Sequence, residues 1–281
     1  MENHSAFYLA EMPKSTTNAS CSSSLTSNDL LVGVGNGLVA HYSSAGSFLN
    51  HLDTGTGATY ETGGCFAPSG EYYQTNFADG SVTKFSASGA VENSRWATLS
   101  GTPESCVVAS DGTVYVGDAS GLLDQFASDG TATSVMFPQT EDRGIDWLSW
   151  GPDDCTLRYT SEGHTVFQYN VCTTSQEAPF ATMAGGPCYE NAPLADGGLL
   201  VACSSDVFRL DSSGNTVATF PAPGDGDAFA LAAAPSASSF YVADLNGSSS
   251  TVYQVDLTTG ATLASFTPSP ELEIDGLTLV P

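Results

Sequence analysis

Apolar and polar residues alternate along most of this chain in short segments, and Gly, Asp, Asn or Ser separates one segment from the next. A period of two is typical of β-strands that bury one face, and turn-forming residues at the breaks strengthen that interpretation. No long window shows a convincing helical period. The pattern therefore predicts an all-β protein.

One phrase recurs in the chain: an apolar strand, a turn of Pro, Ser, Asp or Gly, a strand rich in Tyr and Val, and a third strand with a central aromatic residue. Successive copies of that aromatic residue are 41, 41, 41 and 45 positions apart. A repeat of about 40 residues with four strands is typical of a β-propeller blade. The aromatic positions are Phe85, Phe126, Phe167, Phe208 and Tyr253.

The two ends of the chain supply a sixth blade in two pieces. Residues 277–280 resemble an opening strand, and residues 30–34, 38–42 and 48–52 resemble the remaining three. Pairing the C-terminal strand with the N-terminal strands closes the ring and removes exposed sheet edges. The sequence thus predicts a six-bladed β-propeller over 28–281, after a Ser/Thr-rich arm over 1–27. A β-sandwich with repetitive strands is the alternative, which the even spacing disfavours.

Charge excludes several functions. The chain has 31 Asp and Glu against 6 Lys and Arg, which gives a formal charge of −25. Such a chain repels phosphate backbones, so nucleic acid is excluded as a partner, and binding to anionic membrane surfaces is disfavoured. No apolar run approaches the ~18 residues of a membrane-spanning helix. With 41% hydrophobic residues, the chain can still bury a core.

The pairing of the seven cysteines bears on whether the protein resides in an oxidising or a reducing compartment. Directly opposed residues of a hairpin share a constant index sum, which places two cysteine pairs opposite each other, and a third pair lies on the innermost strands of consecutive blades. Buried free thiols are the alternative. Oxidation favours an extracellular or periplasmic protein whose leader is not in this sequence, over a cytosolic one. The predicted pairs are Cys155–Cys172, Cys188–Cys203 and Cys65–Cys106; Cys21 is left over, and its pairing with another chain stays open.

Acidic residues recur where each innermost strand begins. Aligning the blades on the turn Gly or Asp, or on their strand patterns, places carboxylates around one mouth of the central tunnel. Like charges held close together cost stability, which Ca²⁺ or another divalent cation would relieve. Alternatively, these acids cap turns or bond to backbone amides of the neighbouring blade. The residues are Glu104, Asp146, Glu190, Asp227 and Asp275, with Thr62 and Glu61 at the equivalent place of a further blade.

The stretch Gly144-Ile-Asp-Trp-Leu-Ser-Trp-Gly-Pro-Asp153, followed by Thr156-Leu-Arg-Tyr-Thr160 and Val166-Phe-Gln-Tyr169, resembles the gluconolactonase/senescence-marker-protein propellers. The blade phrases also resemble NHL-repeat and streptogramin-lyase-like propellers. The lactonase resemblance implies a divalent metal held by Glu, Asn and Asp on three inner strands. By position these ligands fall on Asp275, Asp146 and Glu190: all are oxygen ligands, and none is identical to the family's residue.

Two functions follow from these observations. In the first, a secreted propeller holds Ca²⁺ or another divalent cation on its axis, and the metal polarises a lactone or ester carbonyl while Glu104 or Asp227 acts as base. Trp147 would stack on a ligand. In the second, a non-catalytic extracellular propeller binds a small molecule or glycan, or another protein through the 1–27 arm. The histidines are interpreted as surface or packing residues: His4, His41, His51 and His164.

Overall fold

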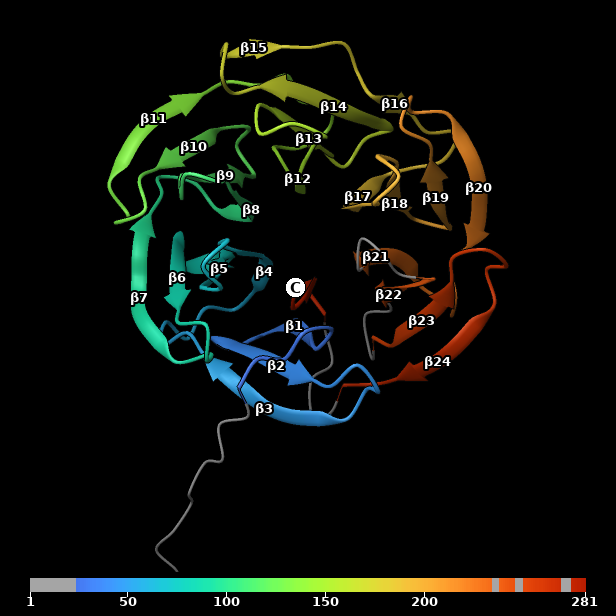
Figure 1. Ribbon diagram of the computed structural model, residues 1–281, viewed down its shortest axis with the longest axis horizontal. Helices are drawn as coiled ribbons and strands as arrows, with labels where there is room; N and C mark the ends of the chain where they lie inside the picture. Colours follow the sequence, from blue (N-terminus) through green and yellow to red (C-terminus); the bar gives the residue numbers. More distant parts are fainter. Residues whose placement is uncertain (1–23, 234–237, 246–249, 269–273) are drawn as a thin grey trace, which may run out of the picture.

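The computed structural model of the chain describes residues 24–233, 238–245, 250–268 and 274–281. Most of the predicted arm, with His4 and Cys21, lies outside these residues. Six antiparallel sheets stand around one central axis, so the ring predicted from the repeat is confirmed (Figure 1). Each sheet is one blade, in which the first strand lies nearest the axis and the last forms the outer edge.

Blade 1 is assembled from both ends of the chain: β25 (Gly276–Leu279), β1 (Leu30–Gly35), β2 (Leu38–Tyr42) and β3 (Phe48–Asp53). Blade 2 contains β4 (Glu61–Phe66), β5 (Tyr72–Asn76), β6 (Ser81–Phe85) and β7 (Val91–Thr98). Blade 3 contains β8 (Pro103–Val108), β9 (Val114–Asp118), β10 (Leu123–Phe126) and β11 (Ala132–Met136).

Blade 4 contains β12 (Leu148–Trp150), β13 (Thr156–Tyr159), β14 (Thr165–Asn170) and the short β15 (Ser175–Gln176) and β16 (Ala181–Thr182). Blade 5 contains β17 (Cys188–Pro193), β18 (Leu199–Cys203), β19 (Asp206–Leu210) and β20 (Thr216–Pro221). Blade 6 contains β21 (Asp227–Ala233), β22 (Ser239–Leu245), β23 (Val252–Asp256) and β24 (Thr262–Phe266).

Ring closure depends on one antiparallel pair, in which β25 lies beside β1 with Leu30 opposite Leu279 and Gly33 opposite Gly276. The aromatic markers of the repeat all lie on the third strands of their blades, as predicted. The core consists of apolar clusters, several of them packed between neighbouring blades; Val82, Trp96 and Phe126, for example, join blades 2 and 3. Burial of such faces is the main stabilising term of the fold.

Hairpin turns use many of the acidic residues. Asp111 Oδ1 accepts a hydrogen bond from the Thr113 backbone amide at 2.9 Å, and Asp211 accepts from the Asn215 side-chain amide and from the backbone amides of Asn215 and Ser213. These bonds hold the pKa of both aspartates below its usual range. Gly112 follows Asp111 at φ +86°, a conformation that L side chains rarely adopt. Turn aspartates therefore account for part of the acidity without any ligand.

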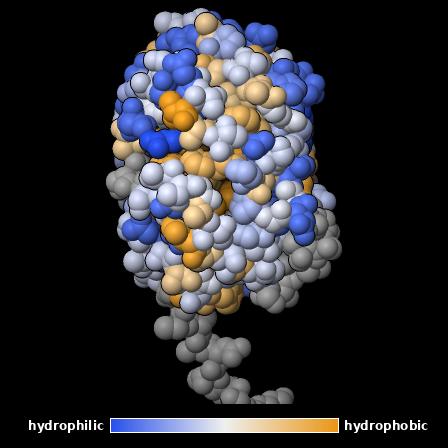
Figure 2. Space-filling view, turned by 90° about the vertical axis from the view of Figure 1, so that its right-hand side faces the viewer, coloured by the Kyte–Doolittle hydropathy of each residue, from blue (hydrophilic) through white to orange (hydrophobic). Residues whose placement is uncertain are grey.

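The edge of the ring is a mixed surface. Seen from the side of blades 5 and 6, apolar residues lie in small patches among hydrophilic ones (Figure 2). Val217 of β20 and Leu263 of β24 are each more than half exposed there. Within the ranges that the structure describes, no helix is long and apolar enough to cross a membrane.

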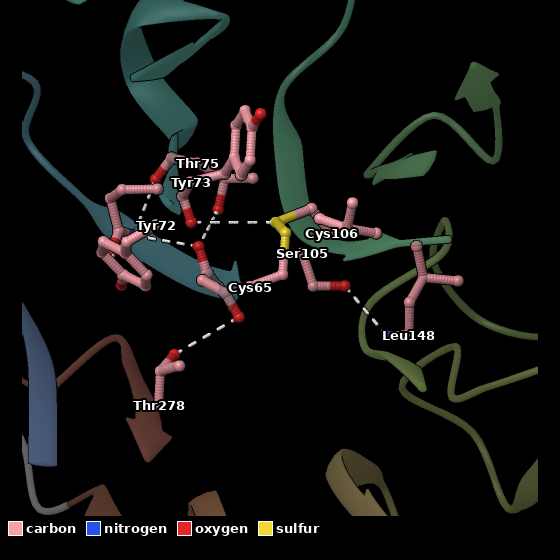
Figure 3. The surroundings of a disulfide bond; sticks show 12 residues. Cys65, Tyr72, Tyr73, Thr75, Ser105, Cys106, Leu148 and Thr278 are labelled. Carbon is pink, nitrogen blue, oxygen red and sulfur yellow. Dashed lines mark hydrogen bonds between the residues drawn. A yellow bond between two sulfur atoms is a disulfide. The ribbon is translucent and has the colours of Figure 1, made fainter. Parts of the chain in front are cut away.

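The three predicted disulfides are all present. Cys155–Cys172 and Cys188–Cys203 each lie within one blade, whereas Cys65 of β4 and Cys106 of β8 link blades 2 and 3 beside Thr278 of β25 (Figure 3). They fit an extracellular or periplasmic location.

We expect the inter-blade disulfide Cys65–Cys106 to stabilise the protein more than the intra-blade disulfide Cys155–Cys172 does, because it closes a loop of 41 residues rather than 17. Replacing Cys65 and Cys106 by Ser should cost about 2–4 kcal/mol of unfolding free energy, roughly 0.8 kcal/mol more than the same change at Cys155 and Cys172. Urea unfolding of both double variants measures the difference. An equal or reversed order would contradict the expectation.

Candidate functional site

The candidate site is a cavity at one mouth of the tunnel, where the innermost strands begin. Its volume is 180 Å³. Carboxyl side chains from four blades line it, as the blade alignment predicted: Glu104, Asp146, Glu190 and Asp275. All four are buried.

Hydrogen bonds between neighbouring blades hold these residues at a common level. Thr75 of blade 2 donates to the Glu104 carbonyl at 3.0 Å, and Ser105 of blade 3 donates to the Asp146 carbonyl at 2.8 Å. Asn191 of blade 5 donates to the Trp147 carbonyl at 2.9 Å. In these three cases a small polar side chain of one blade binds the backbone at the start of a neighbouring inner strand, which helps to bring the acids together.

Arg143 is a site residue that sequence reasoning missed. It lies in the loop before β12, where its guanidinium pairs with the carboxylates of Glu104 and Glu162. Its Cζ atom lies 5.4 Å from the centre of the Phe77 ring, a cation–π contact. A basic residue three positions before Asp146, in a chain with so few, was the available signal.

Glu190 links blades 5 and 6, since its Oε2 atom accepts a hydrogen bond from the Leu231 amide of β21 at 2.5 Å. This contact matches the alternative that the acids bond to the backbone of a neighbouring blade. Burial nevertheless raises the pKa of Glu190 well above its usual value, against the lowering effect of that bond.

Burial also raises the pKa of Glu104 and of Asp146. The negative charge of Asp146 raises the pKa of Glu104 further, whereas Arg143 lowers the pKa of both. The pKa values of these acids are thus shifted upward, whereas those of the turn aspartates are shifted downward.

Two predicted positions lie outside the cavity lining. Asp227 is exposed at the start of β21 and does not line the cavity. The pairing of β21 with β22 shifts register between Ala228 and Ala230. Phe229, which lies between these two residues, lines the cavity instead of Asp227. Glu61 is fully buried beside the cavity, which its neighbour Thr62 lines.

Trp147 separates the cavity from a second one of 450 Å³ at the opposite mouth, and both Trp147 and Glu190 line both cavities. Its Cη2 atom lies 2.9 Å from where a Cβ on Gly276 would stand. Gly276 belongs to blade 1, on the far side of the ring from blade 4 (Figure 1). The indole therefore crosses the tunnel, and the residue predicted to stack on a ligand forms the inner end of the cavity.

The carboxyl groups do not fit the predicted calcium cage. Among the described residues, no three His, Cys, Asp or Glu side chains are grouped so that they could hold a metal ion. Glu104 is paired with Arg143, and Glu190 bonds to the backbone of blade 6. The calcium site stays a prediction.

The histidines of the described ranges lie away from the cavity. His41 is buried, with hydrogen bonds from its ring to Asp29 and Asn50. The ring of His164 contacts the Gly185 carbonyl. Neither lines the cavity, nor does His51.

Comparisons with known proteins identify the fold. No family model matches the chain, and no curated protein matches it. Among solved structures, a chain of the nidogen/laminin complex is similar with a TM-score of 0.74 at 17% identity, covering 90% of this chain and 98% of that one. The fold is the six-bladed β-propeller.

Two further propellers are similar. A protein of unknown function from Bacteroides caccae has a TM-score of 0.68 at 14% identity, with 90% of this chain and 98% of that chain covered. A streptogramin B lyase structure has a TM-score of 0.58 at 13% identity, with 75% and 70% covered. These likenesses confirm, at the level of the fold, the predicted resemblance to NHL-like and streptogramin-lyase-like propellers.

Glu61 makes stability depend on pH. Burial raises its pKa from 4.5 to about 8, helped by the charge of Asp275. The folded protein therefore retains a proton that the unfolded chain has already released, so stability falls as pH rises from about 4.5 to 8. We expect Glu61→Gln to raise the melting temperature at pH 8.5 by a few degrees and to leave it nearly unchanged at pH 4.5.

Melting curves across this pH range measure the effect. The exposed Asp142→Asn removes the same charge and serves as the control. An equal rise in melting temperature for the control would contradict the role of Glu61.

Proposed function

We propose that this chain is a non-catalytic extracellular binding propeller, which takes a side chain of a protein partner into the tunnel-mouth cavity. One observation carries the proposal: the cavity has aromatic walls and a closed inner end, and it lacks a metal-binding group or a histidine from the described ranges. Such a cavity can hold an inserted group, whereas it offers no activated nucleophile.

The rim of the cavity has the composition of an interaction surface. Tyr60 is 38% exposed, and Tyr189 and Phe229 stand beside each other with ring centres 4.9 Å apart. Aromatic residues and Arg are enriched at the centres of protein interfaces, where they contribute most of the binding energy. Arg143 adds the guanidinium to this set.

The net charge of the chain favours basic partners over acidic ones. At −25, the protein attracts basic surfaces over long range and repels acidic ones. A basic partner would associate faster at low ionic strength. The disulfides support secretion, and the similar chain from the nidogen/laminin complex belongs to a propeller protein crystallised with a protein partner.

The metal-dependent lactone or ester hydrolase has weaker support. It needs a cation that the described carboxyl groups do not fit, and its two candidate bases are Glu104, which is paired with Arg143, and Asp227, which lies outside the cavity. Similarity of fold to a streptogramin B lyase is not by itself evidence for a catalytic activity.

Metal removal separates the two functions. We expect the melting temperature to be the same with EDTA and with CaCl₂, because a cation bound only by the folded state would raise it. We also expect no turnover of a chromogenic lactone in either condition. Calcium-dependent stabilisation together with calcium-dependent turnover would overturn the binding function.

Selection from a display library of secreted domains and random peptides tests the binding function itself. We expect purified binders to lose affinity by about tenfold or more when Tyr189→Ala removes one wall of the cavity. Phe137→Ala, which removes an aromatic side chain that is 76% exposed outside the cavity, is the matched control. Binders that tolerate Tyr189→Ala as well as Phe137→Ala would place the interaction elsewhere.

A further inference from the structure

Aromatic side chains form much of the wall of the tunnel-mouth cavity. They come from four blades or the loops beside them: Tyr60, Phe77, Trp147, Tyr189 and Phe229. The rings of Tyr60 and Phe77 meet edge to face with centres 6.2 Å apart. Aromatic faces carry negative potential and attract organic cations, which several rings can surround together.

Arg143 already uses this chemistry within the chain. Its guanidinium lies over Phe77 while it pairs with Glu104. The same wall therefore accepts a planar cation between an aromatic ring and a carboxylate. Arg143 is the only Lys or Arg among the described residues that line the cavity, against four carboxyl groups.

Asp146 supplies a buried carboxyl group that can accept a hydrogen bond from a ligand. It is 7% exposed, it lines the cavity, and its Oδ2 atom has no hydrogen-bond partner among the residues that the structure describes. A buried carboxylate oxygen without a partner is costly, and a ligand that donates to it or places positive charge beside it removes that cost. The charge of Arg143 lowers the pKa of Asp146, but the ion pairs of its guanidinium are with Glu104 and Glu162.

We propose that the tunnel-mouth cavity binds an organic cation, an alkylammonium or guanidinium group, against Asp146 and between the aromatic walls. This inference rests on the proposed function and names the chemistry of the inserted group. Lysine and arginine side chains of a protein partner carry such groups, and so do free amines. Hard divalent cations need oxygen ligands on several sides, and aromatic walls do not provide them.

Calorimetry with choline tests the cation, and 3,3-dimethyl-1-butanol, its uncharged analogue of nearly the same shape, is the matched ligand. We expect choline to bind about tenfold or more tightly than the alcohol. Asp146→Asn should weaken choline binding by about tenfold and leave the alcohol unchanged, whereas Asp142→Asn, an exposed change of the same charge, should leave both unchanged.

Tyr189→Leu provides a second variant that keeps an apolar wall and removes a π face. It should weaken choline binding and spare the alcohol, and unchanged melting curves for each variant show that it folds. Equal binding of choline and the alcohol, or choline binding that tolerates Asp146→Asn, overturns the proposal. Heat from CaCl₂ that Asp146→Asn abolishes assigns the carboxyl groups to a metal and also overturns it.

The source of the cation is decided by comparing choline with N-acetyl-lysine methylamide and with binders from the display library. Lysine-dependent binders that lose affinity in Asp146→Asn support both the cation and the protein partner. Choline binding without any protein binder supports the cation and refutes the protein-binding function. Binders that need Tyr189 but no Lys or Arg, with no choline binding, refute the cation and leave the protein-binding function standing.

Discussion

The antiparallel pair between β25 and β1 is the contact on which the rest of the structure depends. It brings the last strand of the chain beside the first, so that blade 1 exists only when both ends are in place. Closure satisfies the hydrogen-bonding groups that an open sheet would expose. It also places the starts of the inner strands around one axis, which is the condition for any site at the tunnel mouth.

Convergence on an axis has an electrostatic consequence. Acidic residues at the hairpin turns are in contact with solvent and accept hydrogen bonds from backbone or side-chain amides, which lowers their pKa, as at Asp111 and Asp211. Acidic residues at the axis are buried near one another, which raises their pKa, as at Glu104 and Glu190. A single residue type thus serves two purposes, and solvent exposure decides between them.

Other groups of the chain contact these axial acids and fill the tunnel beside them. Arg143 neutralises Glu104, the Leu231 amide bonds to Glu190, and Trp147 fills the tunnel between the two cavities. What remains is a cavity lined by aromatic rings and carboxyl groups, with the Trp147 indole at its inner end. This combination, and not the fold shared with the similar propellers, carries the proposals about binding, because one ring architecture serves many unrelated activities.

The sequence by itself determined the blade repeat, the strands, the closure of the ring and the three disulfides. Each of these depends on spacing: period-two alternation sets the face of a strand, and index sums set which cysteines oppose each other, as at Cys188 and Cys203. Spacing also placed Glu104, Asp146, Glu190 and Asp275 at the tunnel mouth.

Only the tertiary structure decided what those carboxyl groups do. The irregular register of β21 leaves Asp227 outside the cavity while Phe229 lines it, and a loop brings Arg143 against Glu104. Whether a carboxyl group meets water, a guanidinium or a backbone amide depends on residues from other blades. A linear pattern does not encode the depth and direction of those neighbours, because they are fixed by packing between segments far apart in the chain.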